Sequence, residues 1–167
     1  MNITAIIMVI ISTLFVAYYI IQKEIRHCKM LDLTIRLIGT VSSKALYYDQ
    51  PFSDIMFDIK NEDSYKNFPF ICKFCSFIND GCSVPDAWKN ASLSMSGELN
   101  SEEYEMLIQY GEEMCSCNKE DIPDISARVL SEFKEYRQNA VEKRNLRSRS
   151  TAAVTVSVGA VFVLMFV

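Results

Sequence analysis

Both ends of this 167-residue chain are long and uncharged. Residues 1–21 and 150–167 contain no Asp, Glu, Lys or Arg, so every charged side chain lies between them. A helix rises about 1.5 Å per residue, so each stretch is long enough to cross a hydrocarbon layer of roughly 30 Å. The sequence therefore predicts a transmembrane helix at 1–21, another at 150–167, and a domain at 22–149 between them.

Basic residues stand at the inner end of each predicted span. They are Lys23, Arg26, Lys29 and Arg36 after the first span, and Arg137, Lys143, Arg144, Arg147 and Arg149 before the second. The positive-inside rule then places the central domain in the cytoplasm and both termini outside it. The simplest interpretation of the last four is a topology signal. The more specific one is contact with the membrane surface, where each basic residue contributes about 1 kcal/mol.

The spans themselves carry two further signals. The first has no basic segment before it, and the bulky residues from Tyr18 to Ile21 occupy the place of a cleavage site, so we expect an uncleaved anchor. The second contains small residues, among them Gly159 and Ala160, which allow another membrane helix to pack closely.

Helical spacing dominates the central segment, which has the size of one domain. The first helix is expected to continue to about Tyr48, before Pro51, and a short helix is expected at 52–59. A third helix begins near Phe68, is apolar nearly all round, and is closed by Gly81. Its expected core positions are Phe68, Ile71, Cys75, Ile78 and Cys82. Together these features predict an all-α, membrane-anchored helical bundle.

Capping signals mark the remaining helices. Ser83 and Asp86 predict a helix start before buried Trp88, and Asn100 with Glu103 predicts another. The buried side of that helix should hold Tyr104, Leu107, Ile108, Gly111 and Met114. The longest helix should open near residues 118–121 and pack along a nearly heptad seam. The seam consists of Ile122, Ile125, Val129, Phe133, Tyr136 and Ala140.

Charge is distributed unevenly in the domain. Residues 98–124 hold nine acidic side chains and one basic, whereas residues 128–149 hold seven basic and three acidic. The acidic region repels nucleic acid and anionic lipid. It is either a solvated helix face or a docking surface for a basic partner, whose approach its field would speed. The docking hypothesis names Glu102, Glu105, Glu112 and Glu113.

Catalytic chemistry has little support in the sequence. The single histidine, His27, is juxtamembrane, and no phosphate-binding loop, zinc-protease motif or serine-hydrolase motif is present. We predict no enzyme, no cofactor and no metal. Cys72, Cys75, Cys115 and Cys117 offer a weak zinc alternative, but the last pair has an unusual spacing and Cys75 occupies a core step. In a reducing cytoplasm the six cysteines are expected to be free thiols.

The order and spacing of several segments resemble the stage III sporulation protein AB family over nearly the whole chain. The segments are Tyr47-Tyr-Asp-Gln-Pro51, Pro85-Asp-Ala-Trp88-Lys-Asn-Ala91, Leu99 with Tyr104, Gln109-Tyr-Gly111, Arg128 with Leu130, and Gly159. The resemblance implies a helical domain similar to the platform protein of type II secretion systems. It also implies a place in the mother-cell membrane facing the forespore, and it transfers no catalytic residue.

Two functions follow as expectations. In the first, the chain is a non-enzymatic platform of the sporulation channel that couples a cytoplasmic ATPase to membrane channel subunits, and it binds neither nucleic acid nor a small-molecule substrate. In the second, the central domain is exported and braced by disulfides, as in a membrane-tethered receptor or adhesion module.

Overall fold

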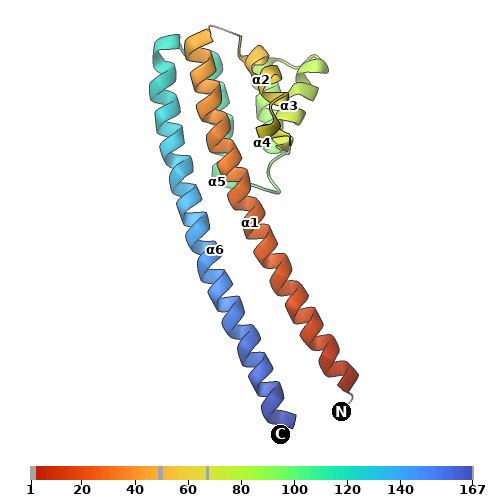
Figure 1. Ribbon diagram of the computed structural model, residues 1–167. Helices are drawn as coiled ribbons and strands as arrows, with labels where there is room; N and C mark the ends of the chain where they lie inside the picture. The colour runs from red at the N-terminus through yellow and green to blue at the C-terminus, as the bar shows by residue number, and fades with distance from the viewer. Residues whose placement is uncertain (1–2, 49–50, 67, 167) are drawn as a thin grey trace. The chain divides into compact units, whose positions relative to one another are not determined.

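The computed structural model describes the backbone of residues 3–48, 51–66 and 68–166, and the side chains of residues 8, 11–12, 14–47, 51–66 and 68–147. In these residues it contains six α-helices and no strand, so the all-α prediction is confirmed (Figure 1). The helices are α1 (Ile3–Tyr48), α2 (Phe52–Lys60), α3 (Pro69–Asn79), α4 (Val84–Leu93), α5 (Ser101–Ser116) and α6 (Ile122–Phe166), with 3₁₀ turns at Asp63–Tyr65 and Lys119–Asp121.

The chain divides into two compact units. One consists of residues 1–28 and 138–167, and the other of residues 29–137. Among the described residues, no helix has a stretch that is both long enough and apolar enough to span a membrane. Most side chains of the predicted spans 1–21 and 150–167 lie outside the described residues. The span boundaries at residues 21 and 149 stay predictions.

The core of the 29–137 unit is built around Trp88, which is 1% exposed. Ring centroids of Phe52, Phe70, Phe74 and Tyr110 lie 4.7–6.0 Å from that of Trp88. The indole Nε1 donates a hydrogen bond of 2.6 Å to the Leu107 carbonyl oxygen, which satisfies the only polar atom of this ring. Trp88 belongs to α4, and the rings around it come from α2, α3 and α5. The aromatic cluster therefore packs α4 against these three helices.

The sequence predicted that α3 is apolar nearly all round and lies at the centre of the bundle, and this prediction is wrong. Phe70, Ile71, Phe74 and Cys75 are fully buried, but Cys72, Lys73 and Ser76 form an exposed face, while Phe77 and Ile78 are half-buried. The Lys73 ammonium stays in solvent, and Cys72 and Ser76 lie on the same side of the helix, so α3 buries one face only. Cys82, another expected core position, is half-buried and follows the helix. Gly81 ends α3 as predicted, with a φ of +88° that favours glycine.

Both predicted helix starts are confirmed. The Ser83 hydroxyl oxygen accepts a hydrogen bond from the Asp86 backbone N–H at 3.3 Å, and the Asn100 backbone N–H donates to the Glu103 carboxylate at 2.8 Å. The start of α6 differs slightly, because a 3₁₀ turn occupies Lys119–Asp121 before the helix begins. Along the α6 seam, four positions are buried and two are half-buried. The buried ones are Ile122, Val129, Phe133 and Ala140, and the half-buried ones are Ile125 and Tyr136.

Candidate functional site

The acidic stripe of α5, which we define as Glu102, Glu105 and Glu112, is exposed to solvent. At about 100° per residue, these positions fall within an arc of about 80° on the helix surface. The buried residues of α5 fall on the opposite side. They are Glu103, Leu107, Tyr110, Gly111 and Met114. The fold therefore presents three carboxylates together on one face of a helix whose other face is fixed in the core.

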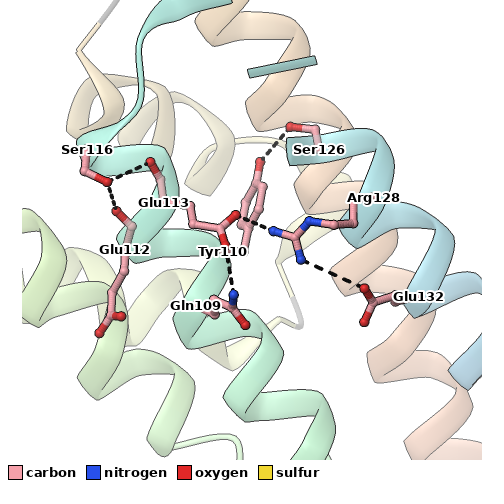
Figure 2. A network of polar contacts seen from close by, with 8 residues as sticks. All are labelled: Gln109, Tyr110, Glu112, Glu113, Ser116, Ser126, Arg128 and Glu132. Carbon is pink, nitrogen blue, oxygen red and sulfur yellow. Dashed lines mark hydrogen bonds and ion pairs between the residues drawn. The ribbon is translucent and has the colours of Figure 1, made fainter. Parts of the chain in front are cut away.

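Glu113, the fourth predicted docking residue, is engaged within the domain. Its carboxylate pairs with the Arg128 guanidinium of α6 and accepts a hydrogen bond from the Gln109 amide at 2.9 Å (Figure 2). Arg128 also lies 3.9 Å from the Glu132 carboxylate. Figure 2 shows the Glu112 side chain extending away from this network. Glu113 is half-buried and neutralised, so it joins α5 to α6 and contributes less free charge to the surface than the acidic stripe does.

Glu102, one residue of the acidic stripe, influences a tyrosine of the neighbouring helix. Burial raises the pKa of Tyr136 in α6, and the carboxylates of Glu132, Glu102, Glu103 and Glu135 raise it further. A negative field favours the neutral phenol over the phenolate. Carboxylates of the α5 N-terminus and of α6 therefore lie close enough to act on the same phenol.

A second feature lies at the other end of α5. An open pocket of about 390 Å³ is lined by the C-terminal part of α1, the start of α2, the end of α5 and the start of α6. The lining residues are Ala45, Pro51, Phe52, Met114, Cys117, Lys119 and Ile122. We call this the α5–α6 pocket. Five of its lining side chains are hydrocarbon or thioether, and the other two are the Cys117 thiol and the Lys119 ammonium, so its walls combine polar and apolar surface in similar amounts.

The six cysteines are free thiols. Cys75 is buried on α3 beside exposed Cys72, and Cys115 is exposed at the end of α5. Burial raises the pKa of Cys75, Cys115 and Cys117, which keeps these thiols protonated near neutral pH. Among the described residues no group of His, Cys, Asp and Glu is arranged to hold a metal ion.

The predicted membrane-surface residues have different environments. Lys143 is exposed, Arg144 is half-buried, and Arg147 pairs with the Glu24 carboxylate in the 1–28 and 138–167 unit. Glu24 is 8% exposed, so this pair neutralises a carboxylate that is almost buried. The Arg149 side chain lies outside the described residues. So do the side-chain environments of Gly159 and Ala160, whose backbone belongs to α6.

The prediction of the buried face of α5 was incomplete. Tyr110 is absent from the predicted core, yet it is fully buried, with its hydroxyl 3.5 Å from that of Ser126. Burial raises the pKa of Tyr110 to about 12. Tyr104 and Ile108, which the sequence predicts in the core, are half-buried. The spacing of Leu107, Tyr110 and Met114, which steps by three and four, is the signal for this face.

Comparison with protein families identifies the chain. The family model described as stage III sporulation protein AB matches residues 2–167, so the chain belongs to this family and the resemblance noted in the sequence is confirmed. Membership implies a role in stage III of sporulation. No curated protein sequence and no solved structure matches the chain significantly.

Proposed function

We propose that this member of the stage III sporulation protein AB family is a non-enzymatic membrane platform, which couples a cytoplasmic ATPase to the channel between mother cell and forespore. The observation that carries the proposal is the acidic stripe. Glu102, Glu105 and Glu112 are exposed on one face of a helix whose opposite face is buried in the core, and this arrangement suits a docking surface.

Membrane attachment at both ends is part of the proposal. The uncharged segments 1–21 and 150–167 have the length of membrane spans. Side chains in the first of them support this, because large apolar residues are 49–70% exposed over more than half of the helix circumference. They are Met8, Ile11, Leu14, Phe15, Val16, Tyr18 and Tyr19. Exposing an apolar surface of this extent to water is unfavourable, and the hydrocarbon chains of lipids would bury it.

The energy for transport comes from a partner in this proposal. The chain has no phosphate-binding loop, and its single histidine, His27, follows the first predicted span. Carboxylates are abundant, but Glu103 caps α5 and Glu113 pairs with Arg128, which are structural tasks. A platform with an exposed docking face and no nucleotide site fits a protein that transmits work from an ATPase to membrane subunits.

Charge reversal on the acidic stripe tests the proposal. Full-length chain in lipid nanodiscs is titrated with the cytoplasmic ATPase of the proposed channel, at low and at high salt. Wild type should bind, and it should bind more weakly as salt rises. The variant Glu102→Lys, Glu105→Lys, Glu112→Lys should bind at least about tenfold more weakly at low salt, since like charges now oppose a basic partner.

A matched control separates local charge from net charge. Exposed carboxylates also occur outside α5, and three of them belong to α2 and to the end of α3, namely Asp54, Asp58 and Asp80. Reversing these three changes the net charge by the same amount on other helices and should leave ATPase affinity within about twofold of wild type. Equal affinity of the α5 variant and wild type at low salt would rule out the acidic stripe as the docking face.

A further inference from the structure

The unit formed by residues 1–28 and 138–167 is positively charged, although the whole chain has a net charge of −4. Its basic residues are Lys23, Arg26, Lys143, Arg144, Arg147 and Arg149, and its acidic residues are Glu24 and Glu142. All of them lie within 22–28 and 138–149, next to the predicted spans. The excess of cations at these two places attracts anionic groups.

The ion pair between Glu24 and Arg147 brings the two basic segments side by side. It joins α1 to α6 within this unit and neutralises a carboxylate that is 8% exposed. Lys23, next to Glu24, and Lys143, about one turn before Arg147, are exposed, and Arg144 is half-buried. These three cations make no ion pair within the part of the chain that the structure describes. Their charges are therefore available to a partner.

Exposed apolar side chains accompany these cations. Leu146 is 61% exposed and follows Lys143 by three residues, so both side chains emerge on the same side of α6. On α1, Ile25 is exposed, and Tyr18 and Tyr19 are exposed about one turn before Lys23. Tyrosines followed by cations and isolated apolar residues are typical of a helix at the membrane–water interface. There the hydrocarbon contacts acyl chains and the cations contact phosphates.

We propose that this interfacial surface binds anionic phospholipids in preference to zwitterionic ones, with Leu146 among the upper parts of the acyl chains. We define the interfacial surface as Lys23, Ile25, Lys143, Arg144 and Leu146. The inference rests on the proposed function, because the two proposed spans place this surface at the bilayer. It adds the class of lipid. The spans alone accept any lipid of suitable thickness, whereas the unpaired cations are neutralised by an anionic headgroup.

Other interpretations account for fewer of these features. A topology signal needs cations beside a span, but it needs no exposed leucine among them. Nucleic acid also presents phosphates, but it offers no acyl chains to cover Leu146 and Ile25. Leu146 lies only about one helical turn before the predicted span at 150–167, so lipid headgroups are the nearest anionic ligand.

Lipid retention by the full-length chain tests the inference. The chain is placed in nanodiscs of equal parts phosphatidylcholine and phosphatidylglycerol, and native mass spectrometry counts the lipids that stay bound. Wild type should retain phosphatidylglycerol over phosphatidylcholine by about threefold or more, and Lys143→Gln with Arg144→Gln should bring the two lipids close to equal retention. A nanodisc has the same solvent on both sides, so a topology signal produces no such preference.

A matched control removes the same charge elsewhere. Lys73 and Lys89 are exposed on α3 and α4, so Lys73→Gln with Lys89→Gln should retain phosphatidylglycerol as wild type does. Fluorescence of the single Trp88 verifies that each variant is folded. A photocrosslinker at position 146 gives the second readout and should attach to phosphatidylglycerol more than to phosphatidylcholine. The same crosslinker at exposed Glu135, about three turns earlier on the same side of α6, should attach to no lipid.

The outcomes separate this inference from the proposed function. If wild type enters nanodiscs and retains both lipids equally, or if the Lys143 and Arg144 variant keeps the full preference, the inference is overturned while the platform function stands. Attachment of the position 146 crosslinker to protein instead of lipid would also overturn it. If wild type does not associate with the nanodisc bilayer at all, the proposed membrane attachment fails and the inference fails with it.

Discussion

Gly111 is the residue whose replacement has the clearest physical consequence. A Cβ added there would overlap the indole ring of Trp88, which is itself 1% exposed and held by its hydrogen bond to Leu107. Either the ring or the helix must shift within a packed core, so we predict that Gly111→Ala lowers the free energy of unfolding by about 1–3 kcal/mol. Chemical unfolding followed by Trp88 fluorescence measures this directly.

Gly39 supplies the control for that substitution. It lies inside α1, and an added Cβ would meet no other atom within 4 Å. Because alanine favours a helix over glycine, Gly39→Ala should leave stability unchanged or raise it by up to about 1 kcal/mol. Equal stability of the two variants would show that Trp88 and α5 do not pack as described.

Tyr110 predicts a dependence of stability on pH. Burial raises its pKa in the folded state to about 12, whereas the unfolded value is near 10. The unfolded phenol therefore ionises first, so the contribution of Tyr110 is complete below pH 10 and is lost as pH rises toward 12. The loss amounts to roughly 2–3 kcal/mol at most.

Tyr110→Phe isolates this contribution from those of other titrating groups. The unfolding free energy of wild type should fall more steeply than that of the variant between pH 10 and 11.5, and the difference between the two should be constant from pH 7 to 9. Parallel curves over the whole range would mean that Tyr110 is accessible to water in the folded protein.

At the scale of single helices, α5 depends on the cap at its N-terminus. The Glu103 carboxylate accepts a hydrogen bond from the Asn100 backbone N–H at 2.8 Å, and the Glu103 side chain is nearly buried. We predict that Glu103→Ala lowers the unfolding free energy by about 1 kcal/mol. Exposed Glu105, two residues later, is the comparison, and Glu105→Ala should change stability by less than about 0.5 kcal/mol. Similar losses for the two would argue against the cap.

Helix existence and helix caps were predictable from the sequence, because they depend on local chemistry. Pro51, Ser83, Asn100 and Gly81 each act within a few residues of their own position. The buried face of α3 was not predictable in the same way. Cys72 and Ser76 are small enough for either environment, so only the packing of α2 and α4 against one side of the helix decides which face is exposed.

The candidate site was predictable in part for the same reason. The cluster of acidic residues and the docking role given to Glu102, Glu105 and Glu112 came from composition and helical spacing. That Glu113 is neutralised depends on Arg128, which is fifteen residues away on another helix. The α5–α6 pocket forms where four separate segments of the chain pack together, and no local pattern in the sequence predicts such a tertiary contact.

At the scale of the whole molecule, we propose that the described helical domain is attached to a membrane at both ends and lies in the cytoplasm, where an ATPase can reach it. The cysteines offer a direct measurement, because all six are free and two, Cys72 and Cys115, are exposed on the domain. A membrane-impermeant maleimide therefore reports which side of the membrane carries the domain.

Labelling of sporulating cells converted to spheroplasts, before and after permeabilisation, is the decisive experiment. Two single-cysteine variants, which retain either Cys72 or Cys115, identify the reacting thiol. We predict that neither thiol reacts in intact spheroplasts, that both react once the membrane is opened, and that the protein stays in the membrane fraction at high salt. Labelling of Cys72 or Cys115 before permeabilisation would contradict the cytoplasmic platform.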